Sequence, residues 1–168
     1  MRTKEPGLNN TLKIVSGGQT GVDRAALDAA LDACVPCGGW CPAGRVAEDG
    51  EIPVSYPLRE VPNGGYRERT LANVRDSDGT AIIHAGEVDG GTLHTLECCV
   101  ENGKPHLLID SKEITVNQAA ELIVEFIKRY RIVTLNVAGP RASKQPQIYP
   151  YAHAVILRFL RRTGKGSR

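Results

Sequence analysis

The chain has 168 residues, of which 41% are apolar and 24% are charged, and its formal net charge at pH 7 is only +2. This length and composition suit one globular domain with a sizeable core, and so small a charge argues against nucleic acid or a membrane surface as a partner. No apolar stretch reaches membrane-spanning length, and five cysteines without a recognisable secretion signal predict reduced thiols and a cytoplasmic location.

The stretch from Ser16 to Arg24 has the sequence Ser-Gly-Gly-Gln-Thr-Gly-Val-Asp-Arg and separates an apolar strand pattern, 12–15, from an alanine-rich helical pattern, 22–34. Its three glycines permit a sharp turn and a close backbone approach, and the first amides of the following helix point into the same space. The motif is neither a Walker A loop nor a complete dinucleotide fingerprint. It predicts an anion-binding turn, with a turn that only permits packing as the alternative. The candidate donors are Gly17, Gly18, Gln19, Thr20, Gly21 and Arg24.

A short second strand is expected at 38–41, followed by a loop from 42 to 57 that is rich in proline, glycine and charge. Loops of this length are usually functional or disordered. The candidate ligand contacts in and just before this loop are Trp40, Arg45, Glu48 and Asp49. In the alternative, the tryptophan caps the core and the charged side chains are only solvated. The spacing of three nearby cysteines could suit a metal, but no second pair follows, so we expect buried small side chains and no metal site. These cysteines are Cys34, Cys37 and Cys41.

The second half of the chain alternates helical and strand patterns. Helices are expected at 66–76, 117–131 and 149–162, and strands at 80–84, 106–110 and 133–137. This alternation predicts an α/β fold with a parallel sheet covered on both faces. We expect a single domain at 12–162 between a polar tail, 1–11, and a basic tail, 163–168.

Two more glycine-containing loops follow predicted strands, at 90–92 and at 138–144, and the first of these opens a further helix. Ligands of open parallel sheets bind outside the carboxyl ends of the strands, so we expect all three loops to lie on one edge. Their candidate ligand contacts are Gly90, Gly91, Thr92, Thr95, Gly139, Arg141, Ser143 and Lys144. The helix after 90–92 also carries Cys98 and Cys99, and one of these adjacent thiols is expected to be exposed.

Five ordered motifs make the chain resemble a family proposed to carry the molybdenum cofactor. They lie at 16–24, 38–42, 73–80, 90–92 and 138–143, and the resemblance runs from Lys13 to Leu160. It implies a Rossmann-like three-layer sandwich with a mostly parallel sheet, usually homo-oligomeric, that holds a phosphate-bearing small molecule with the molybdenum cofactor as possible cargo. In that reading Arg24, Arg141 and Lys144 supply charge-assisted contacts to the anion.

The same superfamily includes the lysine-decarboxylase-like phosphoribohydrolases, and they supply an enzymatic alternative. Residues 67–70 resemble the family's His-Glu-Arg-Lys helix, but 95–97 is one residue short of its Thr-x-x-Glu spacing. If the chain hydrolyses nucleoside 5′-monophosphates, Glu97 is the catalytic carboxylate and Arg69 holds the phosphate; otherwise these two residues form an orienting ion pair. A third reading is an interaction module with a vestigial ligand site. Nothing in the sequence selects a pterin over a purine.

Overall fold

The computed structural model describes residues 11–164 and contains one five-stranded parallel sheet with the order β2-β1-β9-β7-β8. Its strands are β1 (Lys13–Val15), β2 (Cys37–Gly38), β7 (Gly79–His84), β8 (His106–Asp110) and β9 (Thr134–Ala138). The helices are α1 (Val22–Asp32), α2 (Tyr66–Arg75), α3 (Gly90–Glu101), α4 (Val116–Tyr130) and α5 (Ile148–Thr163). The predicted α/β, Rossmann-like fold is therefore confirmed, with elements at nearly the expected positions.

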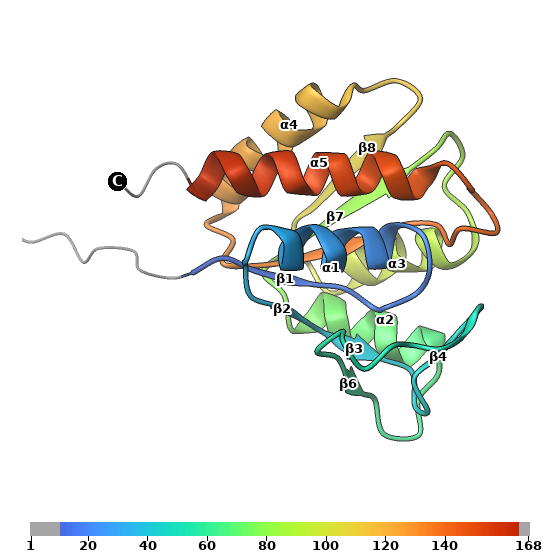
Figure 1. The fold of residues 1–168 in the computed structure, drawn as a ribbon. Coiled ribbons are helices and arrows are strands. Elements are labelled where there is room, and N and C mark those ends of the chain that lie inside the picture. The colour runs from blue at the N-terminus through green and yellow to red at the C-terminus, as the bar shows by residue number, and fades with distance from the viewer. Residues whose placement is uncertain (1–10, 165–168) are drawn as a thin grey trace, which may run out of the picture.

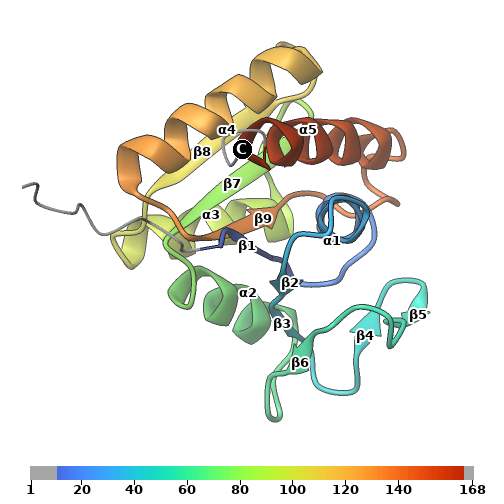
Figure 2. The ribbon, with the colours of Figure 1, turned by 60° about the vertical axis from the view of Figure 1, so that its left-hand side comes forward.

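The sheet is the middle of three layers. Helices α1, α4 and α5 cover one face, and α2 and α3 cover the other (Figures 1 and 2). Along β9, Leu135 and Val137 point into the core under α1 and α5, and Asn136 between them points to the opposite face because strand side chains alternate. The stripe of alanines on α1 is fully buried, which lets this helix lie close to its neighbours.

The last strand of the chain lies in the middle of the sheet. Strand β9 pairs with β1 on one side and with β7 on the other, with Val15 opposite Asn136 and Ile82 opposite Ala138. Three adjacent strands therefore end at one edge, and each is followed by one of the glycine-containing loops. This topology brings the first and third loops together, although Thr20 and Ala142, which are hydrogen-bonded, are 122 residues apart in sequence.

The expected strand at 38–41 is divided in two. Gly39 has φ +126°, and a Cβ at this position would lie 2.4 Å from the carbonyl oxygen of Ser16, so only glycine fits. Beyond it the chain leaves the main sheet, and β3 (Trp40–Cys41) pairs with β6 (Arg59–Glu60) instead. The expectation of one continuous strand was wrong because this bend redirects the backbone.

The segment 42–57 has secondary structure of its own, contrary to the expectation of a plain loop. It contains an antiparallel hairpin of β4 (Val46–Ala47) and β5 (Gly50–Glu51) and a small apolar cluster with Ile52 at its centre. The guanidinium of Arg45 donates to the carbonyl oxygens of three residues of the segment and to that of Leu58, which follows it. Arg45 therefore organises the segment.

The cysteines depart from expectation at two places. Both Cys98 and Cys99 are buried, because α3 is packed between α2 and the sheet and has two covered faces. Cys41 is buried and Cys37 is partly buried, whereas Cys34, expected to be buried, is exposed at the end of α1.

Within residues 11–164, no three His, Cys, Asp or Glu side chains gather in a way that could hold a metal ion. None of the helices described is long and apolar enough to cross a membrane. Of the expected tails, 1–11 and 163–168, residues 1–10 and 165–168 lie outside the described residues.

Candidate functional site

A cleft with a volume of about 240 Å³ opens at the carboxyl ends of β1, β7 and β9, against α2. All three glycine-containing loops contribute to its lining. Ten residues named from the sequence line it: Gly17, Gln19, Arg69, Gly90, Gly91, Thr92, Thr95, Gly139, Arg141 and Lys144. The structure thus gathers these residues around a single cavity.

A buried ion pair forms part of the cleft wall. Nη1 of Arg69 donates to the carboxylate of Asp23 at 2.8 Å, and the backbone amide of Gln19 donates to the same carboxylate at 3.2 Å. Burial raises the pKa of Asp23 and outweighs the opposing charge of Arg69. A Cβ on Gly17 would lie only 1.7 Å from Nη1, so the missing side chain makes room for the guanidinium. Nε of Arg69 is buried without a partner among the described residues, which leaves one donor unsatisfied.

The amino end of α3 faces the cleft with free donors. Within the described chain, the backbone amides of Gly90, Gly91 and Thr92 have no hydrogen-bond partner, as is usual for a first helical turn. The N-cap residue, Asp89, does not cap them, because its carboxylate pairs with Lys144 at 3.1 Å. Unpaired amides at a helix amino end, with cations nearby, form a favourable environment for an anion.

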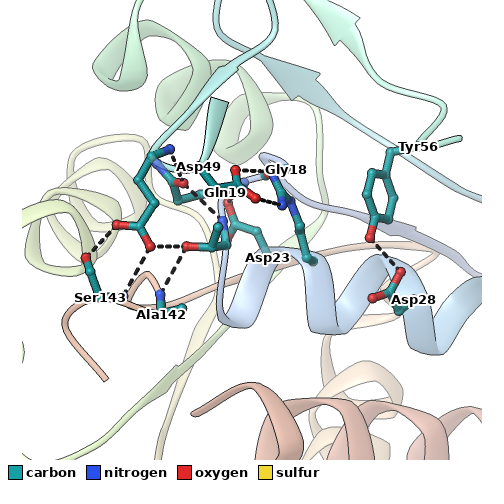
Figure 3. Close-up of polar contacts among 11 residues, drawn as sticks. Gly18, Gln19, Asp23, Asp28, Asp49, Tyr56, Ala142 and Ser143 are labelled. Carbon is teal, nitrogen blue, oxygen red and sulfur yellow. Dashed lines mark hydrogen bonds and ion pairs between the residues drawn. The ribbon is translucent and has the colours of Figure 1, made fainter. Parts of the chain in front are cut away.

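Glu48, in the turn of the β4–β5 hairpin, accepts hydrogen bonds from two other residues that were predicted to contact the ligand. The carboxylate of Glu48 accepts hydrogen bonds from the Thr20 hydroxyl and, at 3.1 Å, from the amide of Ser143 (Figure 3). The Ser143 hydroxyl donates to the same carboxylate, and the Ala142 amide donates to the Thr20 hydroxyl at 3.1 Å. Although burial opposes the change, these hydrogen bonds lower the pKa of Glu48. The side chains of Thr20 and Ser143 are thus used to join the first and third glycine loops to the hairpin.

Arg24 is likewise engaged within the protein. It forms an ion pair with Asp49, which lowers the pKa of that carboxyl, and donates from Nε to the carbonyl oxygen of Gly18 at 3.1 Å. Gly18 packs against apolar side chains, and a Cβ on Gly21 would lie 2.4 Å from the Pro140 carbonyl oxygen. Five of the predicted ligand contacts therefore lie outside the lining of the cleft: Gly18, Thr20, Gly21, Arg24 and Ser143.

The two residues of the enzymatic reading are separated. Arg69 lines the cleft, but Glu97 does not, and the Glu97 side chain is 56% exposed with its carboxylate 3.9 Å from His94. The expected Arg69–Glu97 ion pair is wrong, because Arg69 pairs with Asp23.

The polar residues of the long loop also stay outside the cleft lining. Nε1 of Trp40 donates to Asp76 at 2.7 Å, and its ring lies under the Arg59 guanidinium. The proposed ligand contacts of 40–49 instead hold the segment together and against the glycine loops.

Several lining residues were not singled out from the sequence. They are Asp23, Tyr66, Arg67, Asn73, His94 and Asn136. Asn136 could have been found, since a polar residue between apolar positions of a central strand is buried at a cost unless it has partners. It donates to the Thr80 hydroxyl at 3.2 Å. The residues of α2 carried no such signal, because this helix is polar on most of its surface.

Comparison with known proteins gives two matches. Residues 14–160 match the model of the circularly permutated YpsA SLOG family. The fold is similar to that of a protein from Syntrophus aciditrophicus SB named as a candidate molybdenum carrier, whose crystal structure was determined at 1.45 Å. That match has a TM-score of 0.87 and 46% sequence identity, and it covers 90% of this chain and 96% of the other. No curated protein is significantly similar to the chain.

Proposed function

The chain belongs to the circularly permutated YpsA SLOG family, and from that premise we propose that it binds and carries a phosphate-bearing small molecule, with the molybdenum cofactor as its cargo. The carrier name of the 46% identical neighbour supports a binding role. The observation that carries the proposal is the amino end of α3. Its first three amides have no partner within residues 11–164, and their residues line a cleft shared with the two other glycine-containing loops.

The charges around this helix end suit a phosphate. Arg141 and Lys144 come from the loop after β9, and Arg69 comes from α2. Guanidinium and ammonium groups form stronger hydrogen bonds with anionic oxygens than neutral donors do. Asp23 already neutralises much of the Arg69 charge, so Arg141 and Lys144 are the cations we assign to the ligand.

The chemistry of the lining also suits a carrier. The residues facing the cleft offer amides, hydroxyls, guanidinium groups, an ammonium group and an imidazole, and no cysteine is among them. Such groups can hold the phosphate and the polar ring of a pterin. They would not displace the dithiolene sulfurs of the molybdenum cofactor from its metal. The two carboxylates of the lining, Asp23 and Asp89, are already paired with Arg69 and Lys144. The carboxylate nucleophile or base of a hydrolase would have to reach the ribose, and Glu97 lies outside this lining. We therefore favour binding over hydrolysis.

A pair of charge variants tests the proposal. A Cβ on Gly91 meets nothing within 4 Å, so Gly91→Asp fits while adding a negative charge beside the α3 amides. Val54→Asp adds the same charge at a position that is 85% exposed and outside the cleft lining. Isothermal titration with inorganic phosphate and with ribose 5-phosphate should show at least about tenfold weaker binding for Gly91→Asp, a difference of about 1.4 kcal/mol, and no change for Val54→Asp.

Mass spectrometry of the natively purified protein addresses the cargo. A bound pterin phosphate, absent from the Gly91→Asp variant, is the expected result. If the wild type binds neither anion, or if both charge variants weaken binding equally, the cleft is not the anion site. Release of free base from a nucleoside 5′-monophosphate by the wild type, lost in Glu97→Gln, would instead establish the hydrolase.

A further inference from the structure

A second hollow, with a volume of about 400 Å³, adjoins the cleft. The two cavities share four lining residues: Asp89, Thr92, Pro140 and Lys144. The ion pair between Asp89 and Lys144 therefore stands at the boundary between them. Both of its side chains are substantially exposed, at 63% and 44%, so this pair contributes little stability and its lysine can turn toward a bound anion at small cost.

The cleft alone is small for a complete ligand. Pockets for drug-sized molecules and cofactors usually measure about 300–1,000 Å³, and the cleft measures about 240 Å³. The cleft and the second hollow together reach that range. A ligand whose phosphate lies at the amino end of α3 would thus have its remaining part directed past Lys144.

A buried histidine lies in the wall of the second hollow. His84, at the carboxyl end of β7, is only 8% exposed, and its Nδ1 lies 2.8 Å from the carbonyl oxygen of Gly86. A carbonyl can only accept, so Nδ1 must carry the proton, and Nε2 of the neutral ring is left as an acceptor. Nε2 has no hydrogen-bond partner in the described chain, and it is not one of the fully buried polar atoms without a partner there, so it is in contact with the solvent. It is therefore open to a donor in the hollow.

We propose that the second hollow receives the heterocyclic end of the ligand and that Nε2 of His84 accepts a hydrogen bond from a ring N–H. This inference rests on the proposed phosphate site. Glu87 lines the same hollow and supplies carboxylate acceptors, and Lys112 supplies an ammonium donor. Two acceptors and one donor complement an amino-oxo-pyrimidine ring, which presents adjacent N–H groups and a carbonyl and is common to guanine and the pterins. Adenine lacks this edge, because its ring nitrogen at that position is itself an acceptor.

Two substitutions of the same histidine separate recognition from structure. His84→Asn can still donate to Gly86 in place of Nδ1 but offers nothing at the position of Nε2, whereas His84→Gln can place an acceptor near Nε2. Isothermal titration of the full chain would use guanosine 5′-monophosphate, adenosine 5′-monophosphate and ribose 5-phosphate. We expect the wild type to bind the guanine nucleotide more tightly than the adenine nucleotide. His84→Asn should lose this preference through a five- to tenfold weaker guanine complex, and His84→Gln should keep most of it.

Ribose 5-phosphate is the internal control, because it reaches the cleft but carries no heterocycle. Its affinity should be unchanged in both variants. Equal weakening of ribose 5-phosphate and the guanine nucleotide in His84→Asn would overturn the inference and assign His84 a purely structural role. A wild type that binds ribose 5-phosphate but shows no preference for guanine would overturn it and leave the proposed phosphate site intact. A wild type that binds none of the three would remove both.

Discussion

Replacing Gly17 with alanine tests whether the Arg69–Asp23 pair is held by the space that this glycine leaves. The new methyl group would lie 1.7 Å from Nη1 and 2.6 Å from both Cδ and Cζ of Arg69. Distances this short cannot be relieved by a few tenths of an ångström, so the guanidinium must leave its place. Its 2.8 Å hydrogen bond to the buried Asp23 carboxylate is then lost.

The size of the effect follows from the burial of the pair. Separating a buried ion pair costs about 3–5 kcal/mol, because one charge remains desolvated without its partner. In a domain of this size each kcal/mol lowers the melting temperature by about 2–4 °C, so Gly17→Ala should melt about 6–20 °C below the wild type. Urea denaturation followed by circular dichroism would give the free energy of unfolding directly.

Gly91→Ala is the matched control, because the same methyl group meets nothing within 4 Å there. It should change the stability by less than about 1 kcal/mol, since alanine is the better helix former. In an Arg69→Ala background, Gly17→Ala should cost little more, because the clashing atoms are gone. If Gly17→Ala proves as stable as Gly91→Ala, the guanidinium is not confined as described.

Two further predictions concern groups with shifted pKa values. Glu48, whose pKa is lowered by hydrogen bonds that include one from the Ser143 hydroxyl, should stabilise the protein at pH 7 by about 0.5–1 kcal/mol relative to Glu48→Gln. Because a lowered folded pKa gives stability that is lost as the pH falls through it, the difference between the two proteins in urea denaturation should shrink as the pH is lowered below the ordinary pKa of a glutamate; a difference that stays constant into acid would contradict the reasoning. Burial and the hydrogen bond to Asp28 raise the pKa of Tyr56 to about 12. Asp28→Asn should bring that pKa back toward 10, which the absorbance of tyrosinate during alkaline titration would detect, and an unchanged titration curve would show that burial alone causes the shift.

The fold was largely predictable from the sequence because its signals are local and periodic. The alanine stripe of α1 and the apolar strands β7 and β9 predict their own structure. Alternation of strands and helices then implies a parallel sheet, and glycine loops that follow strands have to share its carboxyl edge. The sequence does not indicate that β9 lies between β1 and β7, but loops that follow parallel strands share the carboxyl edge whatever the order of the strands.

The features that were predicted wrongly have a common physical cause. Each depends on contacts between segments that are distant in sequence. No local pattern indicates that the Gly39 backbone passes close to Ser16 or that Glu48 reaches Ser143, 95 residues further along the chain. Cys98 and Cys99 are both buried only because α2 covers a second face of α3. Helical periodicity alone assigns one buried face, so it leaves one of the two cysteines exposed.

The glycines of the three loops are chemically identical in the sequence but differ in what their backbone meets. Gly21 lets the first and third loops touch, since a Cβ there would lie 2.4 Å from the Pro140 carbonyl oxygen. Gly139 lets the third loop pass close to β7, since a Cβ there would lie 2.1 Å from the Ile83 carbonyl oxygen. At Gly91 a Cβ would meet nothing, and the amides around it have no partner in the described chain. The packing glycines lie where another backbone segment passes close, whereas Gly91 lines the cleft and has room for a side chain. Substitutions at the two kinds of position should therefore separate, with those at Gly139 lowering stability and those at Gly91 changing anion affinity in a folded protein.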